Sequence, residues 1–368
     1  MRLTRLALAN FRNYQLLECE PAPGFNLFVG ANAQGKTNLL EAIAMLGTGK
    51  SFRTSREHEV IREGEVCATL SADAVVDAGE VALACTITAQ GRGSRKVYGV
   101  NGHPVRYASY LGRVRVVTFT PDDLRLVSGP PQGRRALMNA ALAQESPAYY
   151  GALASYGRIL VQKNAYLRAG VPDTALNTIY NERLITCGTQ LMLARNHFVA
   201  ALAQRATTIY RRLVGAGGEE LTLCYRPNVV GASPAQADIA GAFAVKLKAA
   251  AVSEALRRIS LVGPHRDEIE FLLDGKVLSN IGSQGQRRSA VLAVKLAEYG
   301  VLRERGGEAP LLLLDDVLSE LDAQRRDFFL AQLAEIEQVF VTSTAVPPSL
   351  IPARIFEVEQ ARIRQREL

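Results

Sequence analysis

The sequence predicts an α/β fold of the phosphate-loop nucleotide-binding class, divided by a large insertion. The first observation is a glycine-rich segment, residues 30–37, between an apolar run and a helix-forming run. The second is an apolar run, residues 310–314, that ends in two aspartates. The third is their separation by about 280 residues, more than a compact nucleotide-binding domain places between such landmarks.

The glycine-rich segment fits the phosphate-loop pattern of glycine, four residues, glycine, lysine, then serine or threonine. In such a turn the backbone N–H groups surround phosphates, Lys36 reaches the β- and γ-phosphates, and the Thr37 hydroxyl ligates Mg²⁺. We therefore expect ATP or GTP with Mg²⁺ as cofactors. The expected nucleotide-binding residues are Gly30, Ala31, Asn32, Ala33, Gln34, Gly35, Lys36, Thr37 and Asn38.

The insertion changes character along its length. Residues 55–120 are rich in alternating and β-branched residues, which predicts strands, and Asn101-Gly102 is typical of a hairpin turn. The helical period over 134–214 predicts two or three long helices. Residues 226–234 contain two prolines and a glycine, so we expect an exposed loop between the helical and head segments. The expected strands are 66–71, 80–87, 96–100 and 114–119.

A second helix start follows residue 281. Ser283 and Gln286 have the spacing of a capping box, and the minimal interpretation is a capped helix that gains about 1 kcal/mol of stability. A helix N-terminus also favours phosphate, and Gly285 permits close approach to the backbone. Residues Ser283, Gln284, Gly285 and Gln286 resemble the signature motif of ABC-type ATPases.

The apolar run 310–314 predicts a strand buried on both faces. Its carboxyl end is where ligands bind in open α/β sheets. We expect Asp315 to ligate or support the Mg²⁺ beside Thr37, and Asp316 to orient or deprotonate the attacking water. A buried strand with an acidic turn is the alternative. Lys36, Asp315 and Asp316 are the expected catalytic residues.

The ABC-type resemblance implies a site shared between two copies of the chain. In that architecture the signature helix completes the ATP site of a partner, so ATP binding drives an isologous dimer. The segment after the acidic strand resembles the D-loop, which lines the same interface. Its expected interface residues are Ser319, Glu320 and Asp322.

Composition restricts the remaining possibilities. The chain has 368 residues, 48% hydrophobic and 21% charged, as expected of a soluble protein with two or three domains. No apolar run reaches the ~18 residues of a membrane span, so we expect a cytoplasmic protein without a membrane segment. Five scattered cysteines indicate neither a zinc site nor a disulfide framework. The net charge of +7 indicates polyanion binding or merely solvated basic faces.

Seven segments together resemble the bacterial RecF family from end to end. Gly263-Pro-His-Arg-Asp267 shortly before the signature segment is the most specific of them. The others are 11–14, 35–43, 50–53, 119–127, 282–286 and 314–322.

This resemblance implies an ABC-type ATPase head with a short, mainly helical insertion lobe that lacks a long coiled coil. It also implies ATP-dependent dimers on double-stranded or gapped DNA, associated with the nucleoid, that work with RecR, RecO and RecA in gap repair and the SOS response. We expect the N-terminal half of the head at 1–125, a helical second lobe at 126–255 and the C-terminal half of the head at 256–368.

Two departures from general ABC chemistry favour slow ATP hydrolysis. Asp316 stands where many relatives carry glutamate, and residues 341–345 contain no switch histidine. ATP would then act mainly as a dimerisation switch. The alternatives are an SMC-like structural DNA clamp and an ABC-type energy module of a separate transporter, which the basic charge and the insertions disfavour.

Individual polar residues carry weaker expectations. Arg12 is expected among the nucleotide-binding residues, although it and Arg53 can equally serve ATP, DNA or the surface. His265 is either a structural residue or a contact to nucleotide or DNA. The candidate contacts to the DNA backbone are Arg53, Arg134, Arg135, Arg287 and Arg288.

Overall fold

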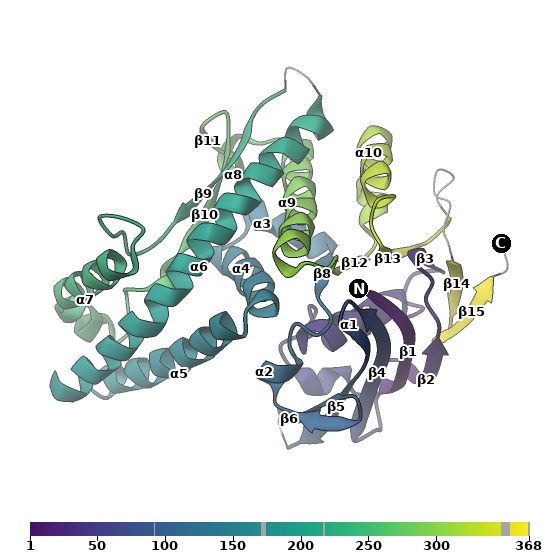
Figure 1. The fold of residues 1–368 in the computed structure, drawn as a ribbon, viewed down its shortest axis with the longest axis horizontal. Helices are drawn as coiled ribbons and strands as arrows, with labels where there is room; N and C mark the ends of the chain where they lie inside the picture. Colours follow the sequence, from purple (N-terminus) through teal and green to yellow (C-terminus); the bar gives the residue numbers. More distant parts are fainter. Residues whose placement is uncertain (92, 171–173, 216–217, 347–353, 367–368) are drawn as a thin grey trace. The chain divides into compact units, whose positions relative to one another are not determined.

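The computed structural model describes residues 1–91, 93–170, 174–215, 218–346 and 354–366 (Figure 1). The chain divides into two compact units. The first combines Met1–Leu124 with Glu298–Leu368, and the second is Arg125–Ala297. The first unit is therefore built from both ends of the chain, as a divided nucleotide-binding fold requires.

One sheet of the first unit is mainly parallel and has the order β15-β14-β3-β13-β12-β8. All its strands are parallel to their neighbours except β15, which runs antiparallel to β14. The strands are β3 Gly24–Val29, β8 Val116–Phe119, β12 Leu311–Leu314, β13 Gln338–Ser343, β14 Arg354–Glu359 and β15 Arg362–Arg366. The four leucines of β12 are buried, which confirms the strand predicted from the apolar run.

The other sheet of this unit is antiparallel, with the order β2-β1-β4-β5-β6-β7. Its strands are β1 Arg2–Phe11, β2 Tyr14–Cys19, β4 Cys67–Val76, β5 Gly79–Gln90, β6 Gly93–Val100 and β7 His103–Val105. The predicted turn joins β6 to β7, with positive φ at Asn101 (50°) and Gly102 (79°). The predicted β-rich character of this region is confirmed.

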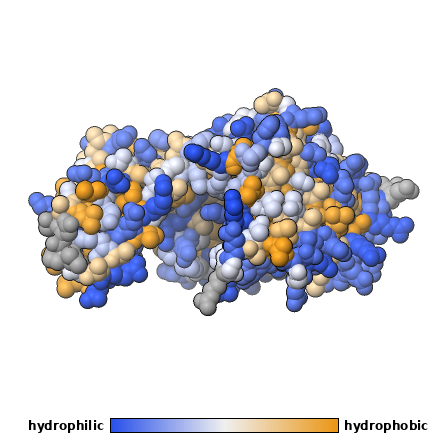
Figure 2. Space-filling model, turned by 90° about the horizontal axis from the view of Figure 1, so that it is seen from below, coloured by the Kyte–Doolittle hydropathy of each residue, from blue (hydrophilic) through white to orange (hydrophobic). Residues whose placement is uncertain are grey.

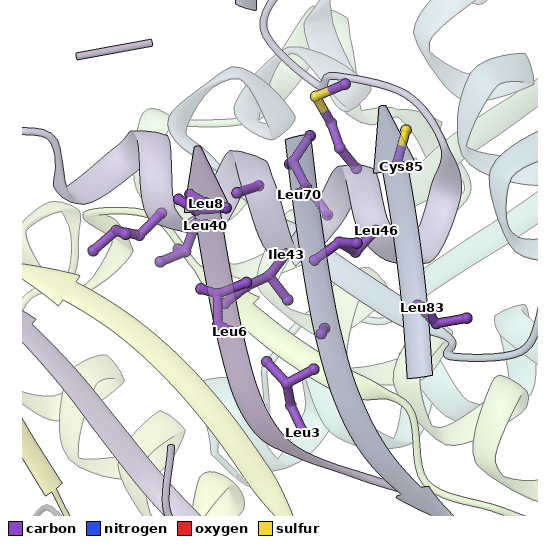
Figure 3. Packing of buried hydrophobic residues seen from close by; sticks show 14 of the residues in the cluster. Leu3, Leu6, Leu8, Leu40, Ile43, Leu46, Leu70, Leu83 and Cys85 are labelled. Atoms are coloured by element: carbon purple, nitrogen blue, oxygen red, sulfur yellow. The ribbon is translucent and has the colours of Figure 1, made fainter. Parts of the chain in front are cut away.

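Helix α1, Lys36–Thr48, packs on the antiparallel sheet. Figure 3 shows Leu40, Ile43 and Leu46 of α1 meeting strand residues that include Leu6 and Leu70. Alternate strand residues point to this face because side chains alternate along a strand. The shorter elements of the unit are η1 Glu57–Val60, α2 Tyr107–Tyr110, η2 Pro121–Leu124, η4 Val317–Glu320 and α10 Ala323–Leu333.

The second unit is mainly helical. Three long helices, α4 Pro131–Glu145, α5 Pro147–Ala169 and α6 Thr174–Val214, confirm the helical prediction. A small antiparallel sheet has the order β11-β10-β9. The remaining elements are α3 Arg125–Ser128, β9 Leu221–Arg226, α7 Gln236–Arg257, η3 Pro264–Arg266, β10 Glu268–Leu273, β11 Lys276–Val277, α8 Leu278–Ile281 and α9 Gln284–Gly306, whose last turns belong to the first unit.

Two expectations about the insertion need correction. The segment 226–234 does not join the helical part to the head, because it connects β9 to α7 inside the second unit. Likewise, the chain divides at residue 297 and not at 255. The reason is that β10 pairs along its whole length with β9, which ties residues 268–273 to the helical unit.

The surface drawn in Figure 2 is largely hydrophilic, with hydrophobic residues in separate patches. Within the described residues, no helix has the length and apolarity to span a membrane.

Candidate functional site

The phosphate loop, residues 30–35, connects β3 to α1 at the carboxyl end of the strand. Gly35 has a φ of 116°, a conformation that favours glycine, and a Cβ there would lie 2.7 Å from the Asn13 side chain. A Cβ on Gly30 would lie 2.2 Å from the carbonyl oxygen of Val358. Both glycines are therefore needed for packing of the loop as well as for access to its backbone.

Two turns outside the motif hold the loop. Asn13 donates to the Gln34 carbonyl (3.2 Å) and Tyr14 to the Gly35 carbonyl (3.1 Å). The backbone N–H of Gln360 donates to Gln34 Oε1 (2.7 Å). The prediction missed this role of Asn13, Tyr14 and Gln360 because the contacts join distant segments. The only available signal was that Asn13 and Tyr14 belong to a family-like motif.

Lys36 points back over the loop. Its ammonium donates to the carbonyls of Gly30 (2.7 Å) and Ala31 (2.8 Å). Burial lowers the pKa of Lys36, against the opposing influence of Asp316 and Asp315. An ammonium has three donors, so a further N–H is available for a phosphate oxygen at the loop.

The acidic strand meets the phosphate loop directly. Thr37 Oγ1 donates to Asp315 Oδ1 (2.8 Å), and Thr342 Oγ1 donates to the same oxygen (2.9 Å). Thr37 and Asp315 are 278 positions apart in sequence. They meet because β3 and β12 are both parallel neighbours of β13, so their carboxyl ends lie at the same edge of the sheet.

The electrostatics of this edge suit a small divalent cation. Burial raises the pKa of Asp315, as does the charge of Asp316, while the hydroxyls of Thr37 and Thr342 oppose the shift. A buried carboxylate in this state is stabilised by a nearby cation. Hard oxygen donors are the ligands that Mg²⁺ prefers, and it commonly takes few of them from protein.

Asp316 has a left-handed backbone, with a φ of 53°. Its N–H donates to Thr342 Oγ1 (2.9 Å), and its carbonyl accepts the Ser319 hydroxyl (2.7 Å). Its carboxylate is partly exposed beside the buried Asp315. Thr342 therefore orients both aspartates, a role that the sequence did not reveal.

Glu41 joins three segments around α1. Its carboxylate is fully buried and accepts two bonds from Arg12, 2.9 Å from Nε and 2.6 Å from Nη2. Ser51 also donates to it, and Arg53 Nη1 lies 3.4 Å away. Arg53 donates more closely to Asn38 Oδ1 (2.6 Å).

These contacts give Arg12 a structural role, and the nucleotide contact expected of it stays a prediction. A third donor of its guanidinium bonds to the Glu59 carbonyl (2.8 Å), so we assign Arg12 to positioning α1. Arg53 remains 44% exposed and stays a candidate DNA contact. The buried Glu41 was missed because a glutamate in the first turns of a helix is typical of solvent-exposed positions.

The helix start after residue 281 has the predicted capping box. Ser283 N–H donates to Gln286 Oε1 (2.6 Å), and Gln286 N–H donates to Ser283 Oγ (3.2 Å). The Gln286 amide nitrogen also donates to the Glu219 carboxylate (2.6 Å). Ser283 and Gln284 are exposed, and Gly285 is partly so. The Ser283 hydroxyl accepts in the box, which leaves its own hydrogen to donate outward.

The segment after the acidic strand has local roles in this chain. Asp322 is the N-cap of α10, accepting from the Arg325 N–H (2.9 Å), and Ser319 stabilises the turn at Asp316. The side chain of Glu320 lies outside the described part of the chain. Ser319 and Asp322 are exposed, as the expected interface requires, although their contact with a second copy stays a prediction.

The arginines expected to contact DNA differ in their surroundings. Arg134 is buried and makes a two-point ion pair with Glu268, so it holds two segments together and the expected DNA contact is wrong. Arg135 donates to the Asp267 carbonyl (2.9 Å) and Arg287 to the Ser279 carbonyl (2.9 Å). Both are partly buried, as is Arg288. For these three residues a DNA contact stays a prediction.

The segment 263–267 has a structural role, because hydrogen bonds connect it to α5 and α6. Arg195 of α6 donates to the Pro264 carbonyl and to Asp267 Oδ2, both at 2.7 Å. His265 Nδ1 lies 2.6 Å from the Tyr156 hydroxyl, and burial lowers the pKa of His265 to about 4. A neutral, partly buried imidazole with a tyrosine partner supports the structural interpretation of His265.

Comparisons with known proteins agree with this geometry. Residues 2–359 match the family model described as RecF/RecN/SMC N terminal domain. The chain is 39% identical over 371 residues to the DNA replication and repair protein RecF of Symbiobacterium thermophilum, covering 99% of this chain and 98% of that protein. It is 38% identical over 351 residues to RecF of Geobacillus thermodenitrificans, covering 94% of this chain and 93% of that protein.

Solved structures match as well. The recombination mediator protein RecF with ATP, from the RecFOR pathway, has a TM-score of 0.91 at 29% identity, covering 100% of this chain and 98% of that chain. An Smc head bound to the C-terminal winged-helix domain of ScpA has a TM-score of 0.57 at 16% identity, covering 100% and 98%, and shows a shared fold alone. The predicted fold class, an ABC-type ATPase head with a helical insertion, is confirmed.

Proposed function

The chain belongs to the RecF family of DNA replication and repair proteins, and on that premise we propose that it is an ATP-dependent DNA-binding protein of recombinational gap repair. The observation that carries the proposal is the 2.8 Å bond between Thr37 and Asp315, which joins the phosphate loop to the acidic strand. This bond assembles the two halves of a nucleotide site from opposite ends of the chain.

ATP is the proposed nucleotide, held with Mg²⁺ at the phosphate loop. Lys36 binds the β- and γ-phosphates, and Thr37 and Asp315 hold the cation. When bound, Mg²⁺ supplies positive charge that neutralises the phosphates during transfer. Asp316 orients the attacking water from the exposed side of the buried Asp315.

The proposed active form is a dimer that ATP holds together. Ser283 of one copy donates its hydroxyl hydrogen to the γ-phosphate bound by Lys36 of the other. The free N–H groups at the start of α9 favour the same negative charge. Because the arrangement is isologous, each of two sites uses both chains. Ser319 and Asp322, both exposed, then lie at the interface.

Hydrolysis is proposed to be slow. The Asp316 side chain is one methylene shorter than a glutamate, and no histidine occurs in 341–345 to sense the γ-phosphate. Bound ATP therefore persists and acts as a switch for dimerisation. On this proposal the dimer binds double-stranded or gapped DNA and assists RecR and RecO in loading RecA, in agreement with the family membership and the net charge of +7.

Sedimentation of the full chain with and without ATP, Mg²⁺ and gapped duplex tests this function. ATP should convert monomer to dimer, and Lys36→Arg should weaken that conversion. Ser283→Arg should bind ATP normally yet remain monomeric, whereas Ser253→Arg, which adds the same charge at an exposed site on α7, should dimerise. Dimer formation by Ser283→Arg at the wild-type level would exclude the shared site.

A second assay separates gap repair from its alternatives. With RecO and RecR present, the wild-type chain should accelerate RecA assembly on gapped DNA. Normal DNA binding without such acceleration would indicate an SMC-like structural clamp. ATP hydrolysis that responds to a membrane permease and not to DNA would indicate a transporter module.

A further inference from the structure

Helix α7 of the second unit has two apolar faces. The inner face packs Ile239, Phe243 and Leu247 into a core cluster with Met192 and Val262. A helix at the surface of a unit normally carries polar residues on the opposite face. The outer face of α7 does not follow that rule.

The outer face carries a regular seam of exposed apolar residues. Val245 is 71% exposed, Val252 is 73% and Leu256 is 79%, with the exposed Ala249 between the valines. Ile259, 41% exposed, continues the series just beyond the helix. Within the helix, successive members are four, three and four residues apart, which is the spacing of the a and d positions of a coiled coil.

The charged residues that flank this seam, called its rim below, are all basic. Lys246 and Lys248 lie at the e and g positions that flank it, and Arg257 and Arg258 follow at the end of the helix, all four exposed. Lys246 also donates to the Asn228 carbonyl. The sole acid between residues 239 and 259 is Glu254, which is buried and paired with Lys163 at 2.6 Å. The rim is thus basic without local compensation.

We propose that the outer face of α7 docks an amphipathic helix of a partner protein, with apolar residues at its a and d positions and acidic residues beside them. The apolar seam supplies the buried contact area, since four spaced side chains on one helix form the usual anchor for a second helix. The basic rim selects the acidic flanks and disfavours basic ones.

The basic residues beside the seam argue against two other possible occupants, a second copy of α7 and DNA. A second copy of α7 would place lysines near lysines at the flanking positions, which is unfavourable. DNA would satisfy the cations but leave the seam exposed to water, because phosphate contacts do not bury apolar side chains. An acidic helix satisfies both features at once.

Fluorescence anisotropy with two labelled synthetic peptides tests the proposal on the full chain. Both peptides have leucine at a and d over four heptads, and they carry glutamate or lysine at e and g. The acidic peptide should bind and the basic one should not. Val252→Asn combined with Leu256→Asn should weaken binding at least ~30-fold, because each change removes a large apolar contact.

Matched variants separate the seam from general effects. Ala244→Asn combined with Ala251→Asn changes exposed positions of the same helix outside the seam and should leave binding unchanged. Lys248→Glu should weaken binding ~3- to 10-fold at low salt and less at high salt. Circular dichroism should be unaltered in all of them, since every changed residue is exposed.

Several results would overturn the proposal. These are failure of the acidic peptide to bind, equal binding of the basic peptide, or wild-type affinity in the Val252→Asn, Leu256→Asn chain. Self-association without ATP that this double variant abolishes would assign the seam to a second copy. Equal weakening of peptide and duplex oligonucleotide by Lys248→Glu would assign the cations to DNA.

Discussion

The Arg12–Glu41 pair beside the phosphate loop offers the most direct test of how this fold is held together. Glu41 is fully buried and Arg12 has a 17% exposed side chain, and two bonds of 2.9 and 2.6 Å join them. Removing one partner of a buried pair typically costs 3–5 kcal/mol. Arg12→Ala should therefore lower the free energy of unfolding by about 3–5 kcal/mol, because Glu41 cannot reach water.

Glu41→Ala should have a smaller effect. Arg12 retains its bond to the Glu59 carbonyl and some exposure, and Arg53 is 44% exposed and can be resolvated. We expect a loss of about 2–4 kcal/mol from this variant. In the double variant both charges of the pair are absent, so its loss should fall short of the sum by about 2 kcal/mol or more.

Urea unfolding of the four chains without nucleotide measures this cycle. The exposed pair Arg5–Glu18, with side chains 40% and 62% exposed, is the control and should couple by less than about 1 kcal/mol. Additive losses at Arg12 and Glu41 would refute the reasoning, because they would mean that neither charge depends on the other.

Three further predictions concern other parts of the chain. The pKa of Asp315 is raised in the folded chain, so the stability gained by protonating it is present below pH 3.8 and is lost as the pH rises through the folded value. Asp315→Asn should therefore keep or raise the thermal midpoint at neutral pH. The same variant should lose the added stability that ATP and Mg²⁺ give the wild-type chain. His265 is protonated near pH 6.5 in the unfolded chain and only near pH 4 in the folded chain. The urea midpoint should therefore decrease as the pH is lowered from 6.5 to 4, and it should decrease less steeply in His265→Gln. Gly30→Ala should abolish the ATP-induced thermal shift by colliding with the Val358 carbonyl, whereas Gly151→Ala, with nothing within 4 Å in α5, should add about 1 kcal/mol. Retained shifts in Asp315→Asn or Gly30→Ala, or a flat pH dependence in the wild-type chain, would contradict these accounts.

Local features could be predicted because their physical cause lies within a few residues. The loop 30–37, the buried strand at 311–314 and the capping box at Ser283 follow from backbone freedom, apolar runs and hydrogen bonding between near neighbours. The helices of the second unit followed from their period in the same way. The phosphate-loop and acidic-strand motifs also predicted that Thr37 and Asp315 lie close together.

Roles that depend on a distant partner were missed or wrong. Arg134 has the composition of a surface cation but lies against Glu268, 134 positions away. The loop 226–234 was misplaced because only the pairing of β9 with β10 shows to which unit it belongs. In both cases the residue type is compatible with several environments, and burial selects among them.

The sequence by itself determined the class of this protein: a phosphate loop, an acidic strand and a capped helix, in an order that belongs to the RecF family. Only the tertiary structure decided which side chains support that machinery, namely Asn13 and Tyr14 under the loop, Glu41 beside α1 and Thr342 between the aspartates. The physical reason is the separation along the chain over which each interaction acts. Turn geometry and helix capping act between neighbours along the chain, whereas desolvation and ion pairing depend on what folding brings into contact.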